Sequence, residues 1–256
     1  MYTSVSTLLG ARFNSDTSCD FLDAYNDFAM QQVIDAETRQ PSQTFAPSTI
    51  RCKRISWFRL RGVAPEPETN VDMGQNFTAQ VGTACHQVIQ NNLALMLGKD
   101  WLDVEEYFIS ANLPYEYKCT KNGTETMVEL TDPPIKFAPD GILRYKDKIR
   151  LLEIKTSEYD SFNKLSAPKP HHMDQIKCYC TLLQLHDAIV IYQDRLYGGI
   201  KCFEVHVTDA EMSAIRNMFT EVQDYVRKNI APPKLPRGDR WCTKSHCRYY
   251  GKCQEW

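Results

Sequence analysis

The chain has 256 residues, of which 43% are hydrophobic and 24% are charged, as is typical of a globular protein with one large domain or one domain with appendages. A formal net charge of −2 argues against a broadly basic protein that coats nucleic acid. No apolar run approaches the roughly 20 residues that cross a bilayer, and the first residues lack the pattern of a secretion signal, so we expect no membrane partner and a cytoplasmic location.

The N-terminal third of the chain predicts three helices separated by loops. Apolar residues at helical spacing indicate a first helix from about residue 19 to 38. A loop with two prolines follows at 40–48, where Ser48 is placed to cap a short basic helix that reaches Trp57. A second break at 64–70 precedes a longer helix over 77–97.

The rest of the chain mixes strands with helices. Asn122-Gly123 lies where a hairpin turn would join two strands. Two further helices are predicted over 171–186 and 209–229, after two short strands within 137–156. The remaining strands are predicted at 105–110, 115–120, 126–130, 188–193 and 201–207.

This order of elements predicts an α/β fold with a mixed central β-sheet flanked by helices. We expect residues 1–45 to form an N-terminal helical extension and residues 46–231 to form the core. Residues 232–256 form a cysteine-rich segment. The extension is either a docking arm or a packing helix.

Basic and aromatic residues alternate in one short segment, "RCKRISWFRLR" at 51–61. Cationic side chains suit a phosphate backbone, and aromatic rings suit stacked bases. The simpler alternative is a solvated helix face with a buried aromatic stripe. On the first interpretation, the residues expected to contact DNA are Arg51, Lys53, Arg54, Trp57 and Arg59.

Three charged residues occur on strands that ought to be buried. Asp140 follows Pro139, and Glu153 and Lys155 come after an interval of twelve residues. Because side chains alternate across a strand, Glu153 and Lys155 share one face, and Asp140 reaches that face if the two strands pair. Converging carboxylates beside an ammonium group suit a divalent cation next to a phosphate. The alternative is an ordinary surface salt bridge.

Two flanking helices add polar residues in a recognisable order. His86 lies on the helix before the strands, and Gln175 and Tyr179, four residues apart, share one face of the helix after them. For each of these residues alone, the alternative to a functional role is that it simply packs in the protein interior. Together with Asp140 and the Glu-x-Lys motif, they resemble the RecB-like branch of the PD-(D/E)XK nuclease superfamily.

The resemblance implies a restriction-endonuclease-like core and a metal-dependent hydrolase. Asp140 and Glu153 would bind Mg²⁺ or Mn²⁺, with His86 and the Ile154 carbonyl as further ligands, and a histidine ligand favours Mn²⁺. Lys155 would position the attacking water and stabilise the developing charge. Gln175 and Tyr179 would orient either the strand or Lys155.

Three of the ten cysteines crowd together near the C-terminus, and their spacing favours a metal over inert thiols. Four residues separate Cys242 from Cys247, and five separate Cys247 from Cys253. With Cys52 they resemble the four ligands of a [4Fe–4S] cluster in RecB-like nucleases, among them CRISPR-adaptation nucleases and AddB subunits. The family usually has two residues in the first gap, so zinc held by these three and either Cys52 or His246 stays open.

The resemblance implies a DNA exonuclease that acts on single-stranded DNA or free ends in recombination, repair or phage DNA processing. The corresponding hosts are bacteria, archaea or phage-infected cells. Two alternatives are a trimming nuclease within a CRISPR-adaptation complex, which would need a protein partner, and a non-catalytic DNA-binding module. The presence of Asp140, Glu153 and Lys155 together argues against the second alternative.

Overall fold

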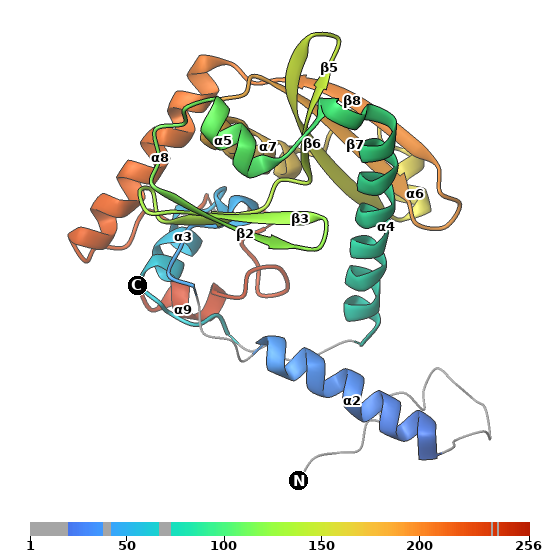
Figure 1. The fold of residues 1–256 in the computed structure, drawn as a ribbon. Coiled ribbons are helices and arrows are strands. Elements are labelled where there is room, and N and C mark those ends of the chain that lie inside the picture. The colour runs from blue at the N-terminus through green and yellow to red at the C-terminus, as the bar shows by residue number, and fades with distance from the viewer. Residues whose placement is uncertain (1–19, 38–41, 67–72, 237, 240) are drawn as a thin grey trace. The chain divides into compact units, whose positions relative to one another are not determined.

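The computed structural model describes residues 20–37, 42–66, 73–236, 238–239 and 241–256 (Figure 1). The chain divides into two compact units, of which the first comprises residues 1–40 and 67–79 and the second residues 41–66 and 80–256. In the first unit, helix α2 spans Asp20–Glu37, close to the predicted range. Helix α4 (Met73–Leu97) begins in the first unit and continues in the second.

A five-stranded mixed sheet forms the centre of the second unit, with strand order β1-β5-β6-β7-β8 (Figure 1). Strands β6 and β7 run parallel, and the other neighbours run antiparallel. The strands are β1 (Trp101–Leu102), β5 (Gly141–Tyr145), β6 (Lys148–Ser157), β7 (Asp187–Asp194) and β8 (Ile200–His206).

A smaller antiparallel sheet has the order β2-β3-β4. Its strands are β2 (Tyr117–Asn122), β3 (Glu125–Leu130) and β4 (Ile135–Phe137). The register pairs Asn122 with Glu125, which confirms the predicted hairpin turn between them. Phe45 extends the sheet by a parallel bridge to Ile135.

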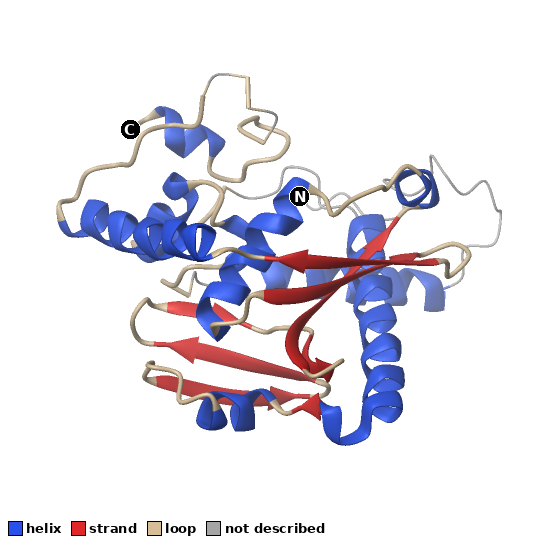
Figure 2. Ribbon diagram, turned by 90° about the horizontal axis from the view of Figure 1, so that it is seen from above, coloured by secondary structure: helices blue, strands red, loops and turns tan. Residues whose placement is uncertain are grey.

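Helices cover both faces of the five-stranded sheet (Figures 1 and 2). On one face, Ile89 of α4 packs with Leu152 and Ile154 of β6. On the other face, α7 (Pro170–Leu183) packs on β6 and β7, and α8 (Asp209–Arg227) packs on α7. The remaining helices are α3 (Lys53–Leu60), α5 (Val104–Ser110), α6 (Tyr159–Asn163) and α9 (Tyr250–Gln254), with short 3-10 turns at Pro47–Thr49 and Gly98–Asp100.

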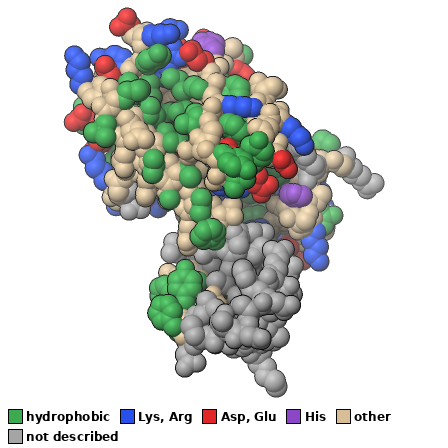
Figure 3. All heavy atoms as spheres, turned by 90° about the vertical axis from the view of Figure 1, so that its right-hand side faces the viewer, with side chains coloured by type: hydrophobic (Ala, Val, Ile, Leu, Met, Phe, Trp, Pro, Cys, Tyr) green, Lys and Arg blue, Asp and Glu red, His purple; other side chains and the backbone are tan. Residues whose placement is uncertain are grey.

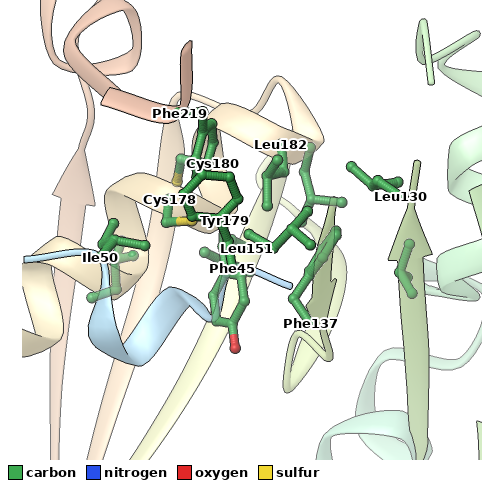
Figure 4. Packing of buried hydrophobic residues seen from close by; sticks show 14 of the residues in the cluster. Phe45, Ile50, Leu130, Phe137, Leu151, Cys178, Tyr179, Cys180, Leu182 and Phe219 are labelled. Atoms are coloured by element: carbon green, nitrogen blue, oxygen red, sulfur yellow. The ribbon is translucent and has the colours of Figure 1, made fainter. Parts of the chain in front are cut away.

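The larger apolar core lies between α7 and the two sheets (Figure 4). Phe45 is fully buried in it, with its ring centroid 4.8 Å from that of Phe219. Tyr179 packs beside Phe137, with ring centroids 5.8 Å apart. Burying aromatic rings of this size supplies much of the driving force for folding. The core therefore includes Phe45, the last residue of the predicted N-terminal extension. The predicted domain boundaries after residues 45 and 231 stay predictions.

Two local expectations are wrong. Residues 105–110, predicted as a strand, belong to helix α5, because Asp103 accepts hydrogen bonds from the amides of Glu105 and Glu106 and so caps the helix. Its buried residues, Val104, Tyr107 and Phe108, follow helical spacing. Ser48 does not cap the basic helix, since α3 begins later and has Cys52 at its N-cap.

Each helix in the described part of the chain is too short or too polar to span a lipid bilayer.

Candidate active site

Asp140 lies between the two sheets rather than on a strand. It follows β4 of the small sheet by three residues and immediately precedes β5 of the large one. The ladder of β5 and β6 starts at Gly141 opposite Leu152, so Asp140 and Glu153 stand side by side just beyond its end. A side-chain carbon on Gly141 would come within 2.5 Å of the Trp101 ring, so glycine at this position allows the close approach.

The end of that ladder frees a backbone donor for the Asp140 carboxylate. The amide of Ile154, which lies beyond the last β5–β6 pair, donates a hydrogen bond to Asp140 Oδ2 at 2.5 Å. The Ile154 side chain is buried on the α4 face of the sheet. Asp140 is thus fixed to the backbone of the same strand that carries Glu153 and Lys155.

Glu153 and Lys155 form an ion pair on the α7 face of β6. Lys155 Nζ lies 2.5 Å from Glu153 Oε1. The Glu153 side chain is 2% exposed and that of Lys155 is 18% exposed. The predicted shared face of these two residues is therefore confirmed, and the pair is largely removed from water.

The second carboxylate oxygen of Glu153, Oε2, is buried and has no hydrogen-bond partner among the described residues. Burial and the negative charge of Asp140 together raise the pKa of Glu153 to about 7, although Lys155 partly opposes them. An unpartnered buried carboxylate oxygen is costly unless a ligand such as a metal ion completes its coordination. The donor set therefore fits the divalent cation that the sequence predicts.

His86 of α4 reaches the same site from the other face of the sheet. Its Nδ1 lies 3.1 Å from Asp140 Oδ1, and both side chains are mostly buried. Because an ionised carboxylate only accepts hydrogen bonds, Nδ1 is the donor in such a contact, which leaves Nε2 as the nitrogen that can bind a metal. A histidine that binds a metal typically donates its other N–H to a carboxylate in this way.

Gln175 and Tyr179 of α7 were expected to orient either the strand or Lys155, and together they contact both. Gln175 Oε1 accepts a hydrogen bond from Lys155 Nζ at 3.1 Å, and its Nε2 donates to the Tyr179 hydroxyl at 3.0 Å. That hydroxyl donates to the Ala138 carbonyl at 3.2 Å. The pair therefore holds Lys155 and the segment that leads into Asp140.

Sequence reasoning missed Gln90, which lies one turn after His86 on α4. Gln90 is 1% exposed, and its Nε2 donates to the Asp140 carbonyl at 2.7 Å. Its Oε1 accepts a hydrogen bond from the Thr124 hydroxyl at 2.9 Å. The available signal was a polar residue four positions after His86, on the same face of the helix.

Replacing Gln90 by Leu is expected to raise the concentration of Mn²⁺ that gives half-maximal activity, because the Asp140 backbone loses its anchor. The unpaired carbonyl and hydroxyl should also lower the free energy of unfolding by about 1–3 kcal/mol. Metal titrations and thermal melts check both effects, with the exposed neighbour Asn91→Leu as the matched control. An unchanged metal requirement in Gln90→Leu would contradict this role.

A neutral histidine also lies close to Lys155. Burial and the positive charge of Lys155 lower the pKa of His172 to about 3. Its Nδ1 lies 2.6 Å from the hydroxyl of Tyr192, which pairs with Lys155 in the β6–β7 register. This contact was not predicted, since the second histidine of a pair at a helix start has no distinctive spacing.

The four cysteines of the predicted cluster come together from α3 and the C-terminal segment. Three of them, Cys52, Cys242 and Cys247, line one pocket of about 210 Å³. Burial raises the pKa of the Cys247 thiol, and negative charge on the other three cysteines, Cys253 included, raises it further. Burial likewise raises the pKa of the Cys52 thiol, although the backbone amides of Ile55 and Arg54 at the start of α3 partly oppose this. Four thiols gathered in one region supply the kind of ligand that a thiolate-bound metal centre needs.

As it stands, no group of three or more His, Cys, Asp or Glu side chains in the described part of the chain is arranged to hold a metal ion. The two donor sets are nonetheless brought together from distant parts of the sequence. His246, the alternative zinc ligand, lines the same pocket as Cys242 and Cys247. The identity of each metal stays a prediction.

The basic segment is used mainly inside the protein, so two of its predicted DNA contacts are wrong. Trp57 is fully buried and offers no surface to a base, and Arg54 is 7% exposed. Arg51 and Lys53 form ion pairs with Asp239 and Glu221. The fifth residue, Arg59, donates to the carbonyl of Thr44 and the hydroxyl of Ser42.

No protein-family model and no curated protein matches the chain. Among solved structures, the crystal structure of SSO0001 matches with a TM-score of 0.50 and 16% sequence identity, covering 90% of this chain and 96% of the other. The alkaline exonuclease LHK-Exo from Laribacter hongkongensis matches with a TM-score of 0.40 and 14% identity, covering 78% of this chain and 93% of that chain. The same enzyme in complex with dAMP gives a TM-score of 0.38 at 14% identity.

At 16% identity, the similarity to SSO0001 supports a shared fold and nothing about function. The similarity to the exonuclease has a lower TM-score and supports no conclusion about this chain. The predicted α/β class, with a mixed central sheet flanked by helices, is confirmed. The architecture is consistent with a restriction-endonuclease-like core. A cysteine-rich segment stands at its C-terminus, as predicted.

Proposed function

We propose that this chain is a divalent-metal-dependent nuclease that hydrolyses DNA phosphodiester bonds. The observation that carries the proposal is the buried Glu153 carboxylate next to Asp140: its Oε1 is paired with Lys155, and its Oε2 has no hydrogen-bond partner among the described residues. Two converging carboxylates, a histidine with a free ring nitrogen and a positioned ammonium form a site suited to a metal-assisted attack on a phosphodiester.

Asp140, Glu153 and His86 would hold Mg²⁺ or Mn²⁺, with the Ile154 carbonyl as a further predicted ligand. When bound, the cation would acidify a coordinated water and neutralise charge on the phosphate. The backbone amide of Ile154 fixes one Asp140 oxygen, and His86 fixes the other. The protein itself therefore sets the direction in which the carboxylate faces.

Lys155 would stabilise the negative charge that develops on the phosphate. Its ammonium group is held by Glu153 and Gln175, so it needs little reorganisation when the charge develops. Tyr179 supports Gln175 and the chain before Asp140. Gln175 and Tyr179 are thus positioning residues in this proposal, whereas Lys155 contacts the reacting phosphate.

The DNA would be held locally rather than by a broad basic surface. Figure 3 shows one face on which Lys and Arg side chains are interspersed with Asp and Glu side chains and with hydrophobic ones. Arg51, Lys53 and Arg59 remain candidates for phosphate contacts, each of them partly exposed. A few such contacts suit single-stranded DNA or free ends, the substrates that the resemblance implies.

The cysteines would carry a [4Fe–4S] cluster or zinc that ties the C-terminal segment to α3. Tyr249 and Phe58 already stack across this junction, with ring centroids 5.2 Å apart. A metal centre would strengthen the same junction without taking part in hydrolysis. Roles in recombination, repair or CRISPR adaptation, with a protein partner, belong to the same proposal.

An end-labelling assay tests the proposed function. The purified full chain is incubated with Mn²⁺ or Mg²⁺ and with linear single-stranded DNA, in parallel with a circle of the same sequence. We expect metal-dependent loss of the linear strand and survival of the circle. Cleavage of both substrates at equal rates would exclude the exonuclease assignment, and cleavage of neither would exclude the nuclease.

A further inference from the structure

Arg54 is a buried cation without an acidic partner among the described residues. Its side chain lies on the first turn of α3, and the residue is 7% exposed. Within the described residues, no carboxylate lies within ion-pair distance of it, whereas two cationic residues just before it, Arg51 and Lys53, pair with Asp239 and Glu221. The position thus buries a permanent positive charge that needs a counter-charge.

The contacts of Arg54 supply oxygen and sulfur but no formal negative charge. Its Nε donates to the Pro232 carbonyl at 2.6 Å, and its Nη1 donates to the Cys253 carbonyl at 3.1 Å. The same Nη1 lies 3.4 Å from Cys253 Sγ. Carbonyl oxygens satisfy the N–H groups but do not neutralise the charge, and buried charges are normally paired or placed beside bound metals.

A metal–thiolate centre would provide the missing charge. Cys253 belongs with Cys52, Cys242 and Cys247, which line the adjoining pocket. Four thiolates that bind one zinc ion or one [4Fe–4S] cluster keep a net negative charge. A guanidinium that donates directly to one of those sulfurs is the contact expected of a counter-ion.

We propose that Arg54 is the buried counter-charge of an anionic metal–thiolate centre at these four cysteines. The residue acts through Cys253 and is a positioning residue, with no part in DNA contact. Arginine suits this place because two nitrogens in a fixed plane, Nε and Nη1, donate to Pro232 and Cys253, whereas lysine has a single donor nitrogen. The inference does not depend on nuclease activity and stands or falls with the cysteine centre.

The test uses the full chain purified without oxygen, with iron and zinc measured by elemental analysis. Arg54→Gln removes the charge and keeps a polar side chain, Arg54→Lys keeps the charge, and Lys53→Gln is the control on the same helix. We expect Arg54→Gln to weaken metal retention against a chelator by about 10- to 100-fold. Arg54→Lys should lose less, and Lys53→Gln should retain metal as the wild type does, whatever its effect on DNA binding.

A double-mutant cycle separates this role from simple packing. Cys242→Ser/Cys247→Ser removes the centre but leaves the contacts of Arg54 to Pro232 and Cys253 in place. If Arg54 is a counter-charge, Arg54→Gln lowers the Tm strongly with all cysteines present and much less, or not at all, in the double-serine background. Equal losses of Tm in the two backgrounds, or a wild-type protein that retains neither iron nor zinc, would overturn the proposal.

Discussion

Replacing Glu153 by Gln or Lys155 by Met is expected to reduce metal-dependent DNA degradation by about 10²- to 10³-fold or more. Glu153→Gln removes a ligand charge from the cation while keeping the size of the side chain. Lys155→Met removes the ammonium group that Glu153 and Gln175 hold in place. Initial rates on end-labelled single-stranded DNA, at saturating Mn²⁺, measure the loss.

Matched controls come from the same sheet. Lys148 begins β6 and pairs with Asp187, so Lys148→Met changes an exposed lysine of the same strand away from the site. Glu204 of β8 pairs with Arg150 at the surface, so Glu204→Gln is the control for the carboxylate. Both controls should keep near-normal rates. Normal rates in Glu153→Gln or Lys155→Met, with intact thermal melts, would remove the catalytic assignment.

The sequence predicted the members of this site better than their arrangement. Alternation along β6 correctly placed Glu153 and Lys155 on one face, because that pattern depends only on backbone geometry. It did not reveal that Asp140 lies off the strand, at the crossing from one sheet to the other. That crossing depends on the separate pairing of β4 and β5, which local sequence does not specify.

Burial explains the remaining errors. The segment around Cys52 mixes basic and aromatic residues in a way that suits either a DNA surface or a packed junction. Trp57 has its ring centroid 5.1 Å from that of Trp256, and Arg54 reaches Pro232. Both partners lie far along the chain, so composition alone does not separate the two interpretations. Gln90 was missed for the same reason, since its partner is the Asp140 backbone.

In buffer without divalent cations, the free energy of unfolding is expected to fall as the pH rises from about 5 to 7. The pKa of Glu153 is about 7 in the folded protein and near the ordinary value of 4.5 when unfolded. Between these values the folded state binds more protons than the unfolded state, so raising the pH favours unfolding. Over the whole titration of this one group, from below pH 4.5 to above pH 7, the effect is about 3 kcal/mol.

Glu153→Gln should flatten this pH dependence, because its side chain does not titrate. The difference between its stability curve and that of the wild type isolates Glu153 from the other groups that titrate in both proteins. The pKa of Glu204 is lowered by its hydrogen bond to Arg150, so Glu204→Gln should leave the slope in this range unchanged. Denaturant unfolding at several pH values measures these slopes.

With Mn²⁺ added, the free energy of unfolding of the wild type should rise rather than fall with pH. Glu153→Gln should not show this reversal. A cation that binds only the folded state stabilises it, and binding at this site requires the ionised carboxylate, so the gain grows as the pH rises. The ionised Glu153 carboxylate therefore destabilises the protein without the cation and binds the cation when it is present. A wild-type slope that Mn²⁺ leaves unchanged would mean that the buried carboxylate of Glu153 is no metal ligand.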